Sequence, residues 1–495
     1  MKTNMKKLFI LLVIACAMAG LMLFLRWCHP VNKGQQAEHK EYDKLVVAYS
    51  GSIGGTKDLQ LVQDELNKIT RKKLGIEVEL KVLNNFKNTI NLMLSGKEQL
   101  DIMTIDNQMY MEAYINQNLW ELDDLLDQYG TGIKEVLGMD NINACRIKGK
   151  LYGLPNNRDF AAGWDAYMLR KDILDKYNIK KEDIKSIEDL EKVFDLILEK
   201  EPGVTPVASS GSMFGNFALA DGINSFPAGG HLNYGQDEEI VNIFETDEYM
   251  ENLKRVRKWY LKGYMGDRIL EDTQSLRDKI REGTVFSYPQ KGKPGIERQE
   301  SMSYGKELVI VQFGENAISY NSLAALPWVI TKNTISKEKS MQLLNLMYTD
   351  ADIMNLLSYG VENIHYVKTE DGHIKLPSGA ASNVFIKGSW KMPNQFITYV
   401  WEGNPLDLWE RMEEYNNSAL RSCEIGFNFD VSEVSTEYIT LEKIYNKYKP
   451  ILESGLVDPE EGLREMMSEL NANGLQEVIG EKRRQFEEWK KEYKK

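Results

Sequence analysis

Short apolar runs alternate with amphipathic segments at the start of the main body of the chain. Residues 45–49 are a strand-like run, and residues 58–74 carry apolar side chains at helical spacing and end at Gly75. Residues 76–83 alternate apolar and polar positions, a short helix follows up to Gly96, and residues 101–106 (DIMTID) are predicted to form another buried strand. This β-α-β-α-β order predicts a parallel sheet covered by helices.

Polar side chains stand where two of these predicted strands end. Tyr49 and Ser50 close the first strand, and Asp106 and Asn107 close the strand at 101–106. Ligands of open α/β sheets bind beyond the carboxyl ends of the strands, so we expect these four residues to face a ligand. Asp106 has an alternative role as the cap of the helix that follows it.

A second α/β region begins after the turn at 151–155. It contains predicted helices at 187–200 and 247–262, a strand at 205–209 and a Gly- and Ser-rich loop at 209–215. Later strands are predicted at 283–288, 307–313 and 323–331. We expect the chain to return to the first region at these late strands. Helices are predicted at 336–348 and 351–359, and the last hundred residues are largely helical.

The turn at 151–155 is followed by a group of polar and aromatic residues near the expected first crossover between the two regions. We take Asn156, Asn157, Arg158 and Trp164 as ligand-binding candidates there, with Tyr288 at the end of a later strand. For Arg158 the alternative is an ion pair between lobes or at the surface. Trp164, Trp390 and Trp401 all lie in polar, turn-like settings, where an indole ring can stack on the apolar face of a sugar; the alternative is closure of a local core.

Charge is distributed unevenly along the chain. The 495 residues contain 61 Lys and Arg against 74 Asp and Glu, and the first 26 residues hold four basic and no acidic residues, so the remainder carries a formal charge of −17. Such a body repels phosphate backbones and argues against nucleic-acid binding. An apolar content of 42% with 27% charged residues is typical of a globular protein.

The basic and apolar residues at the start of the chain indicate that the rest of the protein is exported. Residues 8–25 contain no charge, follow three lysines, and reach about 27 Å as a helix, close to the hydrocarbon thickness of a bilayer. The positive charges before this segment keep the N-terminus inside, so we expect a signal or membrane anchor at 1–30 and a polar tether at 31–43. The sequence leaves open whether the segment is cleaved, is lipidated at Cys16 or Cys28, or is retained.

Motifs for chemistry are absent. The five His residues are scattered, with His365 and His373 on either side of a predicted Asp371-Gly372 turn, and no HExxH, CxxC, GxSxG or SxxK motif occurs, so no metal, cofactor or catalytic residue is expected. The loop at 51–57 lacks the GxxxxGK[ST] order of a phosphate loop and is read as facing a ligand. Cys145 and Cys423 are the cysteines of the body, either paired or two free thiols.

Several motifs together resemble one family. The stretch KGKLYGLP at 148–155 with YMLRKDI at 167–173 resembles the "GK.YG.P … R.D" stretch of family 1 extracellular solute-binding proteins, the receptors of bacterial ABC importers for sugars and oligosaccharides. Residues 343–367 (LLNLMYTDADIMNLLSYGVENIHYV) resemble a segment of one subgroup. Residues 416–489, with NSA at 417–419 and GFNFD at 426–430, are similar to a domain of unknown function that ends such lipoproteins in Gram-positive bacteria.

This resemblance implies an α/β, two-lobed periplasmic-binding-protein-like fold of type II with hinge crossovers and an additional, mainly helical C-terminal region. We expect lobe 1 at 44–158 with a return segment at about 286–345, lobe 2 at 159–285 with about 346–415, and the C-terminal region at 416–495. The implied function is capture of a carbohydrate, an oligosaccharide, by a monomer anchored to the outer face of the cell membrane, for delivery to the transmembrane subunits of an ABC permease.

Two other classes of protein fit the same residues. A membrane-anchored carbohydrate-active enzyme would use paired carboxylates, a signal with little specificity among 74 acidic residues. A glycan-binding adhesin or sensor would bind polymers without lobe closure.

Overall fold

The computed structural model describes residues 42–50, 58–208, 213, 229–266, 269–270, 274–379, 385 and 388–493, and residues 44–495 form one compact unit. The expected anchor at 1–30, nearly all of the tether at 31–43, the loop at 51–57 and most of the loop at 209–215 lie outside the described residues. Within the described ranges no helix is both long and apolar enough to cross a membrane.

The first lobe is built on a four-stranded sheet in the order β12-β3-β1-β2. Its strands are β1 (Asp43–Ser50), β2 (Ile76–Leu83), β3 (Ile102–Thr104) and β12 (Trp328–Ile330). β1 runs parallel to β3, as the sequence predicts, and β12 is antiparallel to β3. Along β1, Leu45, Val47 and Tyr49 pack into one hydrophobic cluster and Val46 and Ala48 into another, so both faces of this sheet are covered.

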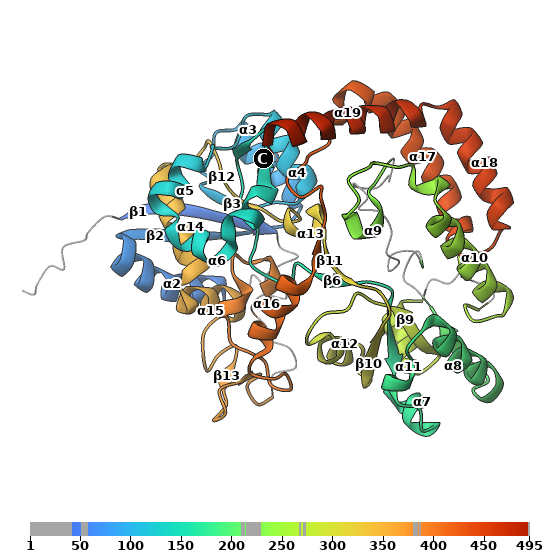
Figure 1. Ribbon diagram of the computed structural model, residues 1–495. Coiled ribbons are helices and arrows are strands. Elements are labelled where there is room, and N and C mark those ends of the chain that lie inside the picture. The colour runs from blue at the N-terminus through green and yellow to red at the C-terminus, as the bar shows by residue number, and fades with distance from the viewer. Residues whose placement is uncertain are drawn as a thin grey trace, which may run out of the picture. The chain divides into compact units, whose positions relative to one another are not determined.

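Helices supply these covers (Figure 1). They are α2 (Leu59–Leu74), α3 (Phe86–Ser95), α4 (Asn107–Ile115), α5 (Asp123–Tyr129), α6 (Thr131–Ile142), α14 (Lys337–Thr349) and α15 (Ala351–Tyr359). α14 contacts α2, α5 and α6, and α15 contacts α2. α2 ends where Gly75 takes a left-handed conformation with φ +63° and its N–H donates to the Arg71 carbonyl, the stop that the sequence predicts.

The second lobe has its own four-stranded sheet, in the order β10-β7-β9-β8. Its strands are β7 (Ala166–Arg170), β8 (Thr205–Val207), β9 (Val285–Pro289) and β10 (Leu308–Gln312), and its helices are α7 (Lys171–Lys176), α8 (Ile187–Lys200), α10 (Asp247–Leu261), α11 (Leu276–Glu282) and α12 (Ile296–Tyr304). α8 has the predicted bounds because Ser186 caps its first turn by accepting from the Asp189 N–H.

Three short strands connect the lobes. β6 (Ala162–Gly163), β11 (Asn316–Ile318) and β15 (Leu420–Arg421) form one sheet in the order β15-β11-β6, with β11 antiparallel to β6 and parallel to β15. Figure 1 shows β6 and β11 side by side between the two lobes. Three passes of the chain therefore cross at one place, where the hinge is expected.

Small elements complete the two lobes. They are the hairpins β4 (Arg146–Ile147) with β5 (Lys150–Leu151) and β13 (Val367–Lys368) with β14 (Ile374–Lys375), and the short helices α9 (Leu232–Gly235) and α13 (Tyr320–Leu323). The β13–β14 hairpin turns at Gly372, with φ +95°, as the Asp371-Gly372 pair predicts.

The C-terminal region is helical, as predicted, and it shares a core with lobe 2. α16 (Leu408–Ser418) leads into this region, whose helices are α17 (Ser435–Leu452), α18 (Pro459–Ala472) and α19 (Leu475–Tyr493). Leu441, Met466 and Phe486 belong to the same buried cluster as Tyr167 of β7 and Trp259 of α10. Removal of α17 to α19 would therefore expose one side of the lobe 2 core.

The sheet pairing differs from the expected lobe boundaries. β9 and β10 pair in the lobe 2 sheet, so the chain returns to lobe 1 at β12 and not at about residue 286. α14 and α15 follow β12 into the lobe 1 core, so the segment from 346 to the end of α15 is not in lobe 2. The apolar pattern of a strand marks its buried positions, but it does not identify the sheet that receives it.

Candidate functional site

A cavity of about 420 Å³ is lined by residues of both lobes. Lobe 2 contributes α12 and the turn before it, and lobe 1 contributes the end of α15 and chain segments between residues 389 and 412, which pack on its core through Met392. The lining residues are Asp159, Lys293, Pro294, Gly295, Arg298, Gln299, Met302, Ser303, Tyr359, Leu376, Ser389, Gln395, Trp401, Glu402, Asn404, Leu408, Trp409 and Met412. A ligand in this cavity would contact residues of both lobes and would therefore stabilise the conformation in which the lobes approach each other.

Aromatic rings form one part of the cavity wall. Trp401 meets Tyr359 edge to face, with ring centroids 5.5 Å apart, and Trp409 stacks on Phe396 at 6.0 Å. The Trp409 Nε1–H donates to the Thr398 carbonyl at 2.7 Å, so the polar edge of that indole is satisfied within the protein. Rings fixed in this way offer apolar surface to a ligand at little entropic cost.

An ion pair between lobes lies at the polar side of the cavity. Lys293, which follows β9 in lobe 2, lies 2.6 Å from the carboxylate of Asp159, which precedes β6. The guanidinium of Arg158 lies 3.3 Å from the same carboxylate. Burial alone would raise the pKa of Asp159, but the charges of Lys293 and Arg158 lower this pKa below its ordinary value. Asp159 therefore stays ionised at neutral pH.

Arg158 also contacts Trp390, a residue far from it in the sequence. Its guanidinium carbon lies 5.1 Å from the centroid of the Trp390 ring, and its Nη2 donates to the Ser322 carbonyl at 2.9 Å. Trp390 is 37% exposed and follows Ser389, which lines the cavity. Arg158 thus makes both the ion pair and a cation–π contact at the edge of the cavity.

Asn156 and Asn157 hold the chain segment that carries Trp390. The Asn156 Nδ2 donates to the carbonyls of Lys391 and Met392, at 2.7 and 3.2 Å, and Asn156 is fully buried. The Asn157 Nδ2 donates to the Asn394 side-chain oxygen at 3.0 Å. In this arrangement the two amides position one wall of the cavity.

The four candidates at the strand ends of lobe 1 have contacts within that lobe and with the C-terminal region. Tyr49 is buried, which raises the pKa of its hydroxyl, and Ser50 precedes the loop at 51–57, which lies outside the described residues. Asp106 caps α4 by accepting from the Met109 N–H at 2.8 Å, the alternative role foreseen for it. Asn107 accepts a hydrogen bond from the Tyr320 hydroxyl, which also contacts Asn428.

Trp164 and Tyr288 lie near the crossover and in lobe 2, respectively. Trp164 directly follows β6, its ring faces the Lys291 ammonium at 4.3 Å from the centroid, and its buried Nε1 has no hydrogen-bond partner. Tyr288 is buried in the lobe 2 sheet, where its hydroxyl donates to Glu300 at 2.8 Å and its ring stacks on Tyr304.

None of the nine candidate residues is among those that line the cavity, although Arg158 borders it through Asp159. Sequence reasoning missed Asp159, Lys293, Arg298 and Trp409. Two sequence signals pointed toward this cavity. The first is the polar run 156–159, of which the candidates included 156–158 but not Asp159. The second is the turn-like setting of Trp401.

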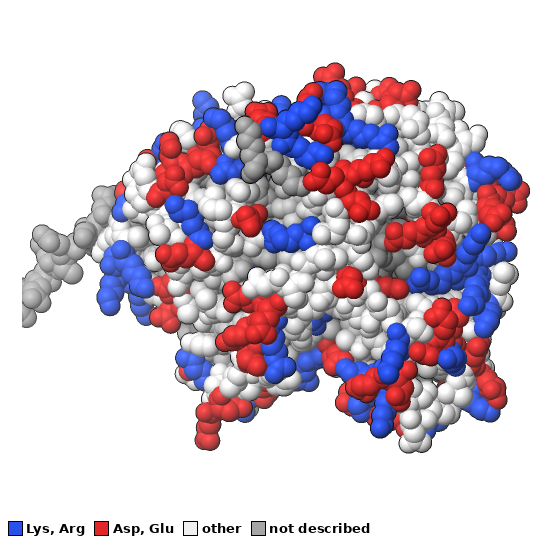
Figure 2. All heavy atoms as spheres, in the orientation of Figure 1, with Lys and Arg blue, Asp and Glu red and all other residues white. Residues whose placement is uncertain are grey.

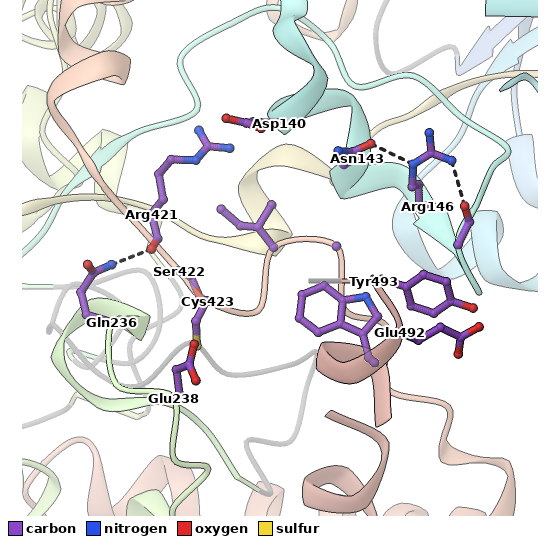
Figure 3. Close-up of a pocket in the computed structure, with 14 residues that line it drawn as sticks. Asp140, Asn143, Arg146, Gln236, Glu238, Arg421, Ser422, Cys423, Glu492 and Tyr493 are labelled. Carbon is purple, nitrogen blue, oxygen red and sulfur yellow. Dashed lines mark hydrogen bonds between the residues drawn. The ribbon is translucent and has the colours of Figure 1, made fainter. Parts of the chain in front are cut away.

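A second cavity, of about 670 Å³, lies where lobe 1, the crossover strand β15 and α19 meet (Figure 3). Its lining includes Asp140, Arg146, Gln236, Arg421 and Trp489. The Gln236 side chain donates to the Arg421 carbonyl, and the Arg421 guanidinium donates to Asn141 at 2.9 Å. The crossover strand is therefore fixed to both lobes by side chains at this cavity.

Groups suited to bind metal are absent from the part of the chain that the structure describes: no three His, Cys, Asp or Glu side chains gather there. Cys145 and Cys423 do not form a disulfide with each other, and the Cys423 thiol donates to the Asp237 carbonyl at 3.6 Å. Acidic and basic side chains are interspersed on the face shown in Figure 2.

Comparisons with known proteins find the same architecture elsewhere. Residues 424–491 match the domain of unknown function DUF3502. A Streptococcus pneumoniae protein described as a carbohydrate ABC transporter substrate-binding protein is 26% identical over 441 residues, which are 86% of this chain and 87% of that protein.

Solved structures agree with this likeness. The N-glycan transport solute binding protein NgtS from S. pneumoniae superposes with a TM-score of 0.81 at 24% identity, over 92% of this chain and all of that one. The same protein in complex with Man5GlcNAc has a TM-score of 0.69 at 24% identity, over 91% and 99%. In its two-lobed fold and in its C-terminal domain, the chain is thus similar to the solute-binding proteins of bacterial ABC importers.

Proposed function

We propose that the protein is an extracytoplasmic receptor of an ABC importer and that it captures an oligosaccharide between its two lobes. The observation that carries this proposal is the cavity lined by Trp401 and Trp409 on one lobe and by polar groups of α12 on the other. The similar S. pneumoniae protein has been solved with a glycan bound, which supports a sugar as the ligand here.

The geometry suits binding by closure of the lobes. A ligand that contacts both lobes favours the conformation in which they approach, because it gains contacts only there. Micromolar affinity needs about 8 kcal/mol, which stacking on two rings and several hydrogen bonds can supply. In this proposal the receptor does no chemistry on its ligand, acts as a monomer, is held at the membrane by residues 8–25 and delivers the ligand to the transmembrane subunits of a permease.

The test is a panel of oligosaccharides measured by thermal shift on the purified protein, with mass spectrometry of the ligand after recovery. A receptor is stabilised by its ligand, by about 2.7 kcal/mol at a ligand concentration of 100 times Kd, and it returns the ligand intact. Recovery of shortened products would instead indicate a carbohydrate-active enzyme. Binding of polymers without stabilisation by any short oligosaccharide would indicate an adhesin or sensor.

Trp164→Ala is expected to weaken binding of the ligand found in this panel about tenfold or more, and to leave the melting temperature of the ligand-free protein nearly unchanged. Trp164 does not line the cavity of about 420 Å³, so this prediction requires a ligand that extends from the cavity to the crossover, where it would stack on the half-buried Trp164 ring. A tenfold change in Kd corresponds to about 1.4 kcal/mol. The measurement is isothermal titration calorimetry.

Trp120→Ala is the matched control for this prediction. Trp120 is also half-buried, its Nε1 also lacks a hydrogen-bond partner, and its ring also faces an ammonium group, that of Lys332 at 3.3 Å, but it lies in lobe 1 beside β12. We expect the ligand affinity of the Trp120→Ala variant to match that of the wild type. Equal affinities for both variants and the wild type would show that Trp164 is not part of the binding site.

A further inference from the structure

Arg298 is a cation without a partner in the wall of the cavity between the lobes. Its Nε is buried and has no hydrogen-bond acceptor, and its guanidinium makes neither a hydrogen bond nor an ion pair with any residue that the structure describes. A guanidinium carries five N–H donors. Most Arg side chains that are partly buried satisfy such donors within the protein, because an unsatisfied charged donor costs more than a neutral one.

The acidic residues beside Arg298 in the sequence are already engaged elsewhere. On the same helix, α12, the Glu297 carboxylate binds the Lys181 ammonium at 2.6 Å and accepts from the Ile310 N–H. The Glu300 carboxylate accepts from the Tyr288 hydroxyl at 2.8 Å. α12 therefore has carboxylates on either side of Arg298 in sequence, and both point to other partners.

The neighbouring backbone fixes where the guanidinium lies. A side-chain Cβ built on Gly403 would fall 2.4 Å from the Arg298 Nε and 2.8 Å from its Cζ, so the guanidinium packs directly over this glycine. Gly403 has φ +88° and follows Trp401 by two residues. The close approach, possible only because Gly403 has no side chain, places the charge next to the Trp401 part of the cavity wall.

The other charges of the cavity leave Arg298 as its available cation. Lys293 and Arg158 share the single carboxylate of Asp159, so this cluster keeps one net positive charge, but both of its cations are held by a partner and Arg298 is not. The carboxylate of Glu402 also borders the cavity, but Glu402 is exposed, where water screens its charge. An anionic group that entered the cavity would thus meet a free guanidinium beside an aromatic wall.

We infer that the ligand is an acidic oligosaccharide, one that carries a carboxylate such as that of a uronic acid, and that Arg298 binds this carboxylate. The planar fork of the guanidinium matches a carboxylate with two parallel hydrogen bonds, which are stronger than those to neutral hydroxyls. The inference rests on the proposed function and names its substrate class.

The test uses pairs of oligosaccharides that differ at one group: a uronic-acid-containing oligosaccharide and its carboxyl-reduced counterpart, in which each carboxylate has become a neutral hydroxymethyl group. Affinities are measured by calorimetry at low and high salt. We expect the acidic member of the preferred pair to bind the wild type at least tenfold more tightly, and this preference to shrink with added salt.

Arg298→Gln is expected to abolish the preference, because it lowers the affinity for the acidic member by more than it lowers the affinity for the reduced member. Arg298→Lys is expected to retain part of the preference. Arg277→Gln is the matched control, because Arg277 also belongs to a lobe 2 helix and lies over Tyr304 without lining the cavity; it should keep the full preference.

Each of three other outcomes would contradict one part of the proposal. Equal binding of both members by the wild type would overturn the acidic ligand and leave the receptor function intact. A preference that survives in Arg298→Gln would overturn the assignment to Arg298. Failure of every neutral and acidic oligosaccharide to bind would overturn the proposed function and this inference with it.

Discussion

Lys482→Met is expected to lower the free energy of unfolding by about 3–5 kcal/mol, because it leaves a buried carboxylate without its charge partner. Lys482 lies on α19 and is 1% exposed. Its ammonium forms an ion pair with Glu424, which is 2% exposed, and donates to the Gly229 carbonyl at 2.8 Å. The measurement is urea unfolding of the ligand-free protein, followed by circular dichroism.

The position of this ion pair explains the size of the effect. Glu424 directly follows the crossover strand β15, and the His231 Nε2 in lobe 2 lies 3.3 Å from its carboxylate. Burial would raise the pKa of Glu424, but the Lys482 charge and a hydrogen bond from the His231 side chain lower this pKa below its ordinary value. One network therefore joins the crossover, lobe 2 and the last helix, and none of its members reaches solvent.

Two further variants separate charge from packing. Lys482→Met combined with Glu424→Leu removes both charges, and we expect this double variant to regain most of the lost stability. Lys490→Met on the same helix breaks two ion pairs near the surface, with Glu238 and Glu487, and should cost less than about 1 kcal/mol. Equal losses in Lys482→Met and Lys490→Met would contradict the role given to the buried pair.

The same network predicts a dependence on pH. Because the folded-state pKa of Glu424 is depressed, its contribution to stability is fully present above its unfolded value of about 4.3 and is lost as the pH falls through the folded value. Only the wild type carries Glu424, so the free energy of unfolding of the wild type should fall relative to that of the double variant as the pH drops through the folded-state pKa of Glu424.

Local pattern was sufficient to predict most elements of the fold. Apolar spacing and end signals placed α8 and β2 at their observed bounds, since capping at Ser186 and burial along β2 are decided by neighbouring residues. The pattern did not show that β9 and β10 join the lobe 2 sheet, because strands of either sheet bury the same kinds of side chains. Pairing is decided by contacts far apart in the sequence.

The candidate site was harder to predict for the same reason. Arg158 meets Trp390, and Asp159 meets Lys293, only after the chain has crossed between the lobes. Trp409 has the spacing of a core residue in an amphipathic helix. Its Nε1–H does donate to Thr398 and its ring stacks on Phe396, yet the residue also lines the cavity. A sequence pattern indicates that an aromatic residue is partly buried, but it does not distinguish a core from a ligand cavity.

Trp401→Ala is expected to weaken ligand binding by ten- to a hundredfold, or about 1.4–2.8 kcal/mol, the largest loss of affinity for one residue of the site. Trp401 lines the cavity beside Arg298, and its ring is held edge to face by Tyr359. Truncation removes the stacking surface and also opens the wall to water, which weakens the polar contacts next to it. The loss is measured by calorimetry with the ligand from the oligosaccharide panel.

Loss of packing around Trp401 needs its own control, because this residue also packs against a small aromatic cluster with Tyr359 and Tyr366. Tyr366→Ala disrupts the same cluster without touching the cavity, since Tyr366 is not among the lining residues. We expect both variants to lower the melting temperature to a similar extent and only Trp401→Ala to lose affinity, with Trp401→Phe retaining part of it. A parallel loss of affinity in Tyr366→Ala would show that the cluster acts by supporting the wall, and that Trp401 need not touch the sugar.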